Sequence, residues 1–183
     1  FRTTADGSNS LTEQMRIDNQ GCITTPNQPM VYAFRNSTQD LNPDTSWETV
    51  IFNDESTTND TAFDVGGDYN TGTGVFTAPA DGKYLISTEV MLTNAPASSG
   101  YILLNLITTK AVADGINQYS GRVNPGSWDA EMDYYQIAGT WLANMSSGDT
   151  AYINVSNTVA DGDTKIYGAS TTTYTRIQIM KVA

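Results

Sequence analysis

The stretch Asp68-Tyr69-Asn70-Thr71-Gly72-Thr73-Gly74-Val75-Phe76-Thr77-Ala78-Pro79-Ala80-Asp81-Gly82-Lys83-Tyr84 combines glycine-rich turns with short apolar segments. Gly74 and Gly82 permit tight turns, because a residue without a Cβ atom tolerates backbone conformations that other residues resist. Phe76 and Tyr84 supply large apolar side chains for burial. The stretch therefore predicts strands that are joined by tight turns and anchored in a core by aromatic rings.

The clearest strand, Lys83–Leu92, begins at the end of this stretch. Its side chains alternate between two faces, as expected of a strand with one buried side. The apolar face holds Tyr84, Ile86, Val90 and Leu92, and the polar face holds Ser87 and Glu89. The next run, Tyr101–Ile107, is almost continuously apolar. We expect both of its faces to be covered, either by a second sheet or by a partner subunit.

Further strand-like segments lie on both sides of this region, separated by turns rich in Gly, Thr, Asn, Ser and Asp. They are Val31–Arg35, Trp47–Phe52, Val75–Ala78, Tyr134–Leu142, Ala151–Ser156 and Tyr174–Met180. Many short strands at close spacing predict an all-β sandwich or jelly roll.

The N-terminal residues form a different kind of segment. Two prolines in Thr25–Pro29 resist both a helix and a central strand, so we place a domain border there. Residues 1–29 are then a shaft or attachment segment, and residues 30–183 are the jelly-roll head. Within the segment, Ser10–Glu13 has the spacing of a helix capping box. The alternative, which we favour, is a short β-hairpin of Met15–Ile17 and Cys22–Thr24.

Composition excludes several classes of function. The 183 residues carry a net charge of -11 and contain no His. The acidity disfavours nucleic acid and anionic membranes as partners, and no apolar run is long enough for membrane insertion. Without His, Ser-His-Asp and Cys-His catalysis are excluded. The single Cys22 allows no intrachain disulfide. The chain begins at Phe1 without an apolar leader, so we expect a fragment or a processed product.

The central stretch resembles the signature of the C1q domain family. The matching residues are Tyr69, Thr73, Gly74, Phe76, Thr77, Pro79, Gly82 and Tyr84. Gly148–Tyr152 resembles the Gly-Asp turn before a late strand of the same family. The closing segment Tyr174–Ile177 departs from the Phe-Ser-Gly-Phe that the family usually has there. The resemblance spans roughly residues 30–183 and implies a ten-stranded C1q/TNF-like jelly roll that assembles as a tight homotrimer.

A second resemblance lies in the N-terminal segment. Glu13–Pro26 is similar to the Met-Arg-Ile-Asp, turn, Gly repeat of marine phage tail fibres, which often carry that repeat before a C1q-like tip. Cys22 departs from the polar residue that is usual in the repeat. This resemblance implies a bacteriophage structural protein, located in the virion on the tail or the capsid surface.

Candidate binding residues come from loop-like sequence. Trp128, Tyr134 and Tyr135 follow Asn124–Ser127, and exposed aromatic residues suit sugar or protein contacts. Asp161 and Asp163, like Asn53–Glu55, could bind calcium through carboxylate oxygens. Ordinary polar turns are the favoured interpretation of both acidic groups. No catalytic residue, other cofactor or reliable metal ligand is assigned.

These observations predict a non-enzymatic binding protein, the distal part of a trimeric tail fibre. Its head would contact a host surface glycan or protein, and its N-terminal segment would join other virion structural proteins. Three weak loop sites on one rigid head would give avidity. The predicted binding loops are Asn53–Asp60, Ala111–Asp133 and Asn157–Thr164. One alternative is a capsid decoration or head-fibre protein attached through residues 1–29. Another is a secreted, extracellular C1q-like lectin, and a third is a carboxylate-dependent glycan hydrolase on a virion.

Overall fold

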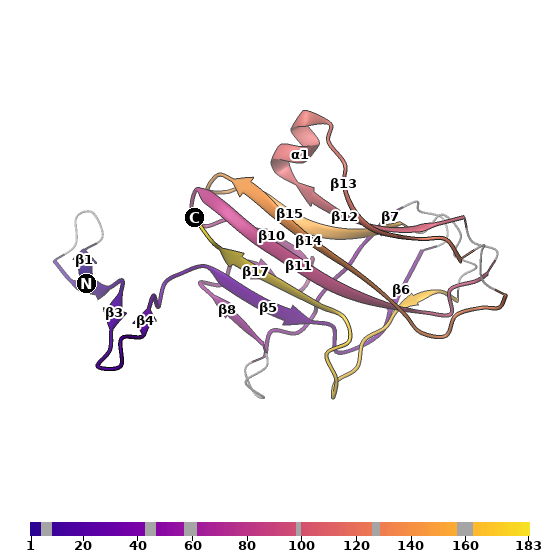
Figure 1. Ribbon diagram of the computed structural model, residues 1–183, viewed down its shortest axis with the longest axis horizontal. Helices are drawn as coiled ribbons and strands as arrows, with labels where there is room; N and C mark the ends of the chain where they lie inside the picture. Colours follow the sequence, from indigo (N-terminus) through magenta and orange to yellow (C-terminus); the bar gives the residue numbers. More distant parts are fainter. Residues whose placement is uncertain (5–8, 43–46, 57–61, 98–99, 126–128, 157–162) are drawn as a thin grey trace.

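The computed structural model describes residues 1–4, 9–42, 47–56, 62–97, 100–125, 129–156 and 163–183. Two β-sheets pack face to face, and the N-terminal segment extends away from one end of this sandwich (Figure 1). The described residues contain one short helix, α1, which spans Thr109–Asp114. No helix in the described ranges has the length and apolar character needed to cross a membrane.

The first sheet has six strands in the order β13-β12-β15-β10-β9, with β7 paired to β15 on the same side as β10. Every pairing in it is antiparallel. Its strands are β7 (Trp47–Thr49), β9 (Tyr69–Asn70), β10 (Val75–Thr77), β12 (Ile102–Thr108), β13 (Gln118–Val123) and β15 (Thr150–Ser156).

The second sheet has seven strands, in the order β6-β16-β11-β17-β5-β8, and β14 pairs along the other edge of β11. Its strands are β5 (Met30–Phe34), β6 (Gln39–Asp40), β8 (Phe63–Val65), β11 (Gly82–Thr93), β14 (Tyr135–Met145), β16 (Lys165–Ile166) and β17 (Arg176–Lys181). The two-residue strands β6, β9 and β16 bring the described total above the ten strands implied by the C1q resemblance.

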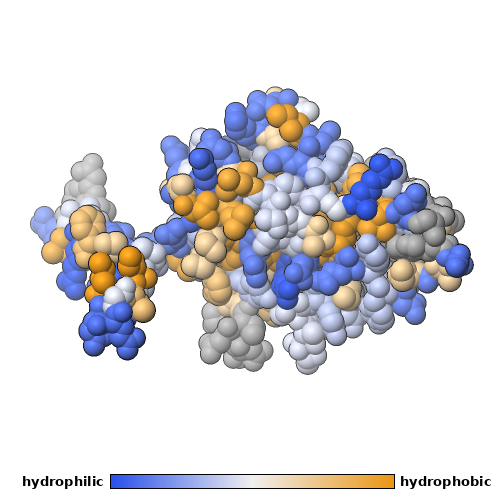
Figure 2. All heavy atoms as spheres, in the orientation of Figure 1, coloured by the Kyte–Doolittle hydropathy of each residue, from blue (hydrophilic) through white to orange (hydrophobic). Residues whose placement is uncertain are grey.

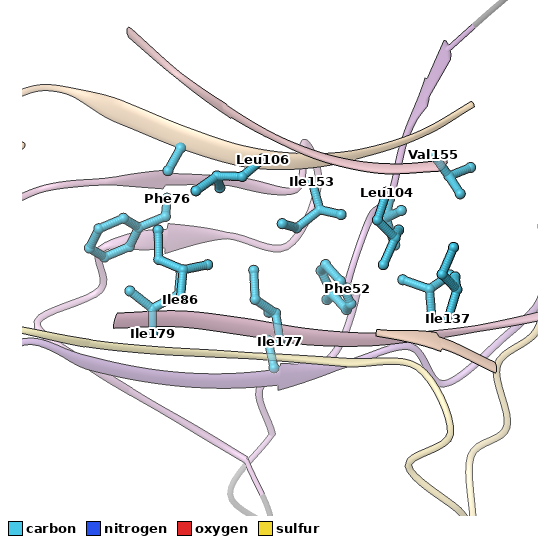
Figure 3. Packing of buried hydrophobic residues seen from close by; sticks show 14 of the residues in the cluster. Phe52, Phe76, Ile86, Leu104, Leu106, Ile137, Ile153, Val155, Ile177 and Ile179 are labelled. Carbon is cyan, nitrogen blue, oxygen red and sulfur yellow. The ribbon is translucent and has the colours of Figure 1, made fainter. Parts of the chain in front are cut away.

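The core lies between the two sheets. Figure 3 shows Leu104, Leu106 and Ile153 from the six-stranded sheet pointing toward Ile86 and Ile177 from the seven-stranded sheet. All five side chains are almost fully inaccessible to water. Burial of this apolar surface is the main source of stability, at roughly 25 cal/mol per Å² removed from water.

The central stretch is tied to the core at several points. The rings of Phe76 and Tyr84 are in tilted contact, with 5.5 Å between their centroids. The hydroxyl of Tyr84 donates to the carbonyl oxygen of Ala80 at 2.7 Å. Gly74 has a φ of 76°, and a Cβ atom built there would lie 2.7 Å from the carbonyl oxygen of Val50. The glycine is therefore required both by the left-handed backbone and by this close approach.

The N-terminal segment forms two separate two-stranded sheets, and among the described residues neither pairs with a strand of the sandwich. Strand β1 (Arg2–Thr4) pairs with β2 (Leu11–Glu13), and β3 (Arg16–Ile17) pairs with β4 (Ile23–Thr24). The β3–β4 pair is the hairpin that the sequence favoured. The helix suggested by the capping-box spacing of Ser10–Glu13 is wrong, because Leu11–Glu13 is a strand.

The structure confirms the strongest strand predictions and corrects others. In β11 the predicted apolar face is buried, and β12, β15 and β17 lie within one or two residues of their expected bounds. The loop conformation predicted for the binding segment Ala111–Asp133 is wrong, because the segment contains most of α1 and all of β13. Its role in binding stays a prediction. Both ends of helix α1 are capped. The Thr108 hydroxyl accepts a hydrogen bond from the Ala111 N–H at the N-terminus, and Gly115 adopts the left-handed conformation at the C-terminus. For Tyr101–Ile107, the second sheet covers only one face, and Tyr101 is 38% exposed, so coverage of the other face by a partner subunit stays a prediction.

Candidate assembly face and distal tyrosine cluster

The outward face of the seven-stranded sheet carries a row of apolar side chains. Leu142, Leu85, Met180 and Met30 lie opposite one another on β14, β11, β17 and β5. Directly opposed residues in antiparallel strands point to the same face. Leu142 is 61% exposed, Met180 42% and Leu85 38%. Figure 2 shows hydrophobic side chains gathered on the sandwich toward the N-terminal segment, near the start of β11 and the end of β17.

A second row lies beside the first and adds aromatic rings. Thr140, Ser87, Gln178, Tyr32 and Phe63 are opposed in register on β14, β11, β17, β5 and β8. The rings of Tyr32 and Phe63 are stacked, with 6.1 Å between their centroids. Between the two rows is a shallow hollow of ≈ 280 Å³, lined mainly by apolar atoms. We call the two rows together the assembly face.

The assembly face ends at a charged pair. Arg176 and Glu89 are opposed on β17 and β11, and their Nη2 and Oε2 atoms are 2.8 Å apart. Gln136 of β14 also donates to Glu89 Oε2, at 2.7 Å. The hydrogen bond to Glu89 raises the pKa of Arg176. A pair that is about one-third exposed contributes only about 0–1 kcal/mol. A partner that excluded water would strengthen the attraction between the charges, at a cost in lost hydration.

Three tyrosines form a cluster at the opposite end of β11 from Gly82. The Tyr134 and Tyr167 rings meet edge to face at 5.3 Å, and the Tyr167 and Tyr174 centroids are 5.5 Å apart. Tyr134 is 59% exposed and Tyr174 is 37% exposed. The hydroxyl of the fully buried Thr175 donates to the Tyr167 carbonyl oxygen at 2.6 Å and accepts from the Met91 N–H. These bonds fix the backbone under the rings. We call Tyr134, Tyr167 and Tyr174 the distal tyrosine cluster.

Comparison with known proteins places this geometry in a fold group. No family model matches the chain, and no curated protein matches it either. The globular domain of zebrafish complement 1qA protein is similar in structure, with a TM-score of 0.58 and 16% sequence identity, over 85% of this chain and 98% of that chain. Murine APRIL is similar with a TM-score of 0.54 and 9% identity, over 85% of this chain and 99% of that chain.

The chain has a C1q/TNF-like jelly-roll fold. This confirms the all-β sandwich expected from the central stretch, which forms β9, β10 and the start of β11. The likeness is one of fold, so the roles of the C1q-like head's surfaces must come from its own residues.

The predicted binding residues are scattered over the C1q-like head. Tyr134 belongs to the distal tyrosine cluster, whereas Tyr135 is only partly exposed and packs against the core. Asp163 is exposed just before β16. Trp128 and Asp161 lie outside the described residues, as do parts of the predicted loops Asn53–Asp60 and Asn157–Thr164. Sequence reasoning missed Tyr167 and Tyr174, which join Tyr134 from distant parts of the chain.

Three acidic side chains, Glu55, Asp64 and Asp54, lie near one another around β8. Within the described ranges, no group of three or more acidic or Cys side chains is arranged to hold a metal ion. In the predicted calcium turn Asn53–Glu55, Asp54 instead accepts hydrogen bonds from Asn36 Nδ2 and from the Ser56 N–H. Partial burial raises the pKa of Glu55, with smaller contributions from the charges of Asp64 and Asp54. One oxygen of Glu55 is inaccessible to water and has no hydrogen-bond partner.

Proposed function

We propose that this chain is a homotrimeric binding head whose copies associate through the assembly face. The observation that carries the proposal is the apolar row Leu142, Leu85, Met180 and Met30, with the stacked rings of Tyr32 and Phe63 beside it, on the outward side of a sheet in a chain with a net charge of -11. Contiguous apolar surface in water favours association. The C1q resemblance of Asp68–Tyr84, which implies a tight homotrimer, supports a closed ring of three copies.

In a cyclic trimer all copies point the same way along the symmetry axis. With the axis along the length of the sandwich, the three N-terminal segments would gather at one end of the assembly (Figure 1). The three distal tyrosine clusters, which lie where β11 ends and β14 begins, would gather at the other. Three equivalent sites on one rigid head bind a repetitive surface more strongly than one site does. This arrangement suits adhesion without catalysis.

The finer proposal is that the head is the tip of a bacteriophage tail fibre that contacts a host surface glycan or protein. Its support is the resemblance of Glu13–Pro26 to tail-fibre repeats. In the described part of residues 1–29, strands β1–β4 pair with no strand of the sandwich, which agrees with an attachment role. A capsid decoration protein attached through the same residues, and a secreted lectin, are the alternatives.

The first test is the mass of the 183-residue chain in solution, measured by light scattering. A trimer gives about 59 kDa, three times the 19.8 kDa of one chain. A monomer over the whole concentration range would refute the assembly proposal. Immunogold labelling of virions then tests the location: label at fibre tips supports the finer proposal, and label on the shell favours the decoration protein.

A further inference from the structure

The outward face of the six-stranded sheet carries a second set of partly or fully exposed aromatic residues, on the opposite side of the sandwich from the assembly face. The rings of Trp47 and Tyr119 are parallel to within 2°, with 5.8 Å between their centroids. Tyr119 is 49% exposed. Trp47 comes from β7 and Tyr119 from β13, so strands at opposite sides of the sheet contribute to this stack.

The strand that carries Tyr119 also carries a cation, Arg122. The guanidinium of Arg122 lies over the ring of Tyr101, 4.7 Å from its centroid. Tyr101 is 38% exposed, and Arg122 is also exposed. Such a contact orients a guanidinium while its N–H groups stay accessible. Lys165 and Arg176 each pair with a carboxylate, whereas Arg122 has no carboxylate at ion-pair distance among the residues the structure describes.

An irregularity in β13 brings Tyr119 and Arg122 to the same face. In a regular strand, residues three positions apart point to opposite faces. Here Tyr119 lies opposite Asn105 and Arg122 opposite Leu103, because the β12–β13 register shifts between Leu103 and Leu104. Gly121 is the extra residue, which has no partner on β12 and shifts the in-and-out alternation of β13 by one position. The side chains of Tyr119 and Arg122 therefore both point outward.

Gly121 makes this bulge possible. Its φ is 64°, and a Cβ atom there would lie 2.8 Å from Ile137 Cγ1 and 2.9 Å from the Ala138 carbonyl oxygen. Only glycine fits this backbone and this space without strain. Bulges often redirect a side chain at a functional surface. We call Trp47, Tyr101, Tyr119 and Arg122 the outer platform.

We propose that the outer platform binds a carboxylate-bearing sugar of a surface glycan. Aromatic faces carry partial negative charge and attract the C–H groups on the face of a pyranose ring. A guanidinium forms paired, charge-assisted hydrogen bonds with a carboxylate. The net charge of -11 repels densely charged polyanions at long range, so an isolated acidic sugar in a mostly neutral glycan fits best. This inference rests on the proposed binding role and names a surface and a ligand class for it.

The test measures binding of the full chain to immobilised oligosaccharides by biolayer interferometry. The probes end in glucuronic, galacturonic or sialic acid, each beside a neutral counterpart, and polyglutamate serves as the acidic peptide. We expect at least one acidic sugar to bind about ten-fold more tightly than its neutral counterpart, which corresponds to about 1.4 kcal/mol.

Substitutions then assign the binding to the platform. Arg122→Gln should lower the affinity for the acidic sugar to that for its neutral counterpart. Tyr119→Ala should weaken the binding of both the acidic and the neutral sugar. Lys110→Gln removes one exposed positive charge on α1 and should change neither. Unchanged thermal unfolding and trimer mass in each variant would show that the fold and the assembly are retained.

Three results would overturn the inference: no acidic sugar binds, Arg122→Gln binds like the wild type, or polyglutamate binds as tightly as the sugars. A trimer that still adheres to cells after both platform substitutions would refute this inference alone. A monomer that adheres to nothing would refute the proposed function as well.

Discussion

Leu85 and Leu142 lie directly opposite each other on β11 and β14, and both point away from the core into solvent. Their neighbours in the strands, Tyr84 and Ile86 on β11 and Ala143 on β14, are buried. The same strand pair therefore supplies part of the interior of the head and, on its other side, an exposed apolar surface that the proposed trimer would bury.

Leu142→Glu should convert the trimer to a monomer without unfolding the head. A carboxylate at an apolar interface loses its hydration without gaining a partner, at a cost of several kcal/mol. Light scattering should report a mass near 20 kDa, one chain of 19.8 kDa. The matched control is Val112→Glu on α1, which is similarly exposed at 64% and should stay trimeric. A trimeric Leu142→Glu variant would contradict the assignment of the assembly face.

Gly74→Ala should destabilise the head more than Gly148→Ala. Both glycines have positive φ, 76° and 88°, so both substitutions incur the same kind of backbone strain, about 1 kcal/mol. At Gly74 the added Cβ would come close to the Val50 carbonyl oxygen. At Gly148 nothing lies within 4 Å of an added Cβ. Urea unfolding should show an extra loss of about 1–2 kcal/mol at Gly74. Equal losses would show that the close approach relaxes at no cost.

Phe76→Ala and Tyr84→Phe should separate packing from hydrogen bonding in the central stretch. Phe76 is 1% exposed, so its truncation leaves a cavity and should cost about 3–5 kcal/mol. Tyr84→Phe keeps the ring contact and removes only the hydroxyl bond to Ala80, at about 0.5–1.5 kcal/mol. Chemical denaturation of both variants would check the order of the two losses, and a larger loss for Tyr84→Phe would contradict it.

Glu55→Gln should stabilise the head at neutral pH and have little effect in acid. The raised pKa of Glu55 means that the folded chain holds this proton more tightly than the unfolded chain does. The contribution of this carboxyl group to stability is therefore fully present below its ordinary pKa of 4.5 and is lost as pH rises through the raised value. The amide imitates the protonated form. With allowance for solvent screening, calorimetry should show a gain of about 1–2 °C at pH 7. A gain of equal size at pH 3 would exclude this cause.

Removal of residues 1–24 should leave the head folded and trimeric. Strands β1–β4 pair only with one another in the described part of the chain, whereas Gln28 and Pro29 hydrogen-bond to Lys181 of β17 and would be retained. The midpoint of thermal unfolding should move by less than about 2 °C. A large drop, or loss of the trimer mass, would show that the N-terminal segment stabilises the head.

Sequence reasoning succeeded where one face of a strand is buried. The alternation of β11 predicted Tyr84 and Ile86 as core residues, and the glycines of the central stretch predicted its turns. It missed β13 because the bulge at Gly121 breaks the period of two and because only Val123 in that strand is buried. It missed α1 because a six-residue helix has no periodic signal of its own.

The surfaces were harder to predict than the core. Leu85 lies between Tyr84 and Ile86, on the strand face that also holds Ser87, Glu89 and Met91, and an apolar residue next to Ser87 on this face was the available signal for the assembly face. The distal tyrosine cluster and the outer platform have no such signal. Their members come from strands and loops far apart in the chain, and only the sheet pairing brings them together.

The way the N-terminal segment enters the sandwich determines how the head would carry mechanical load. The chain passes from Pro29 directly into β5, which is antiparallel to β17 from Met30 to Phe34, and β17 in turn pairs with β11. Hydrogen bonds between antiparallel strands lie perpendicular to the strands. Tension along β5 between its start and the far end of the sandwich would therefore shear all the bonds of the ladder together instead of opening them one at a time. A head attached in this way would resist a sudden pull along its N-terminal segment far better than its thermal stability alone would suggest.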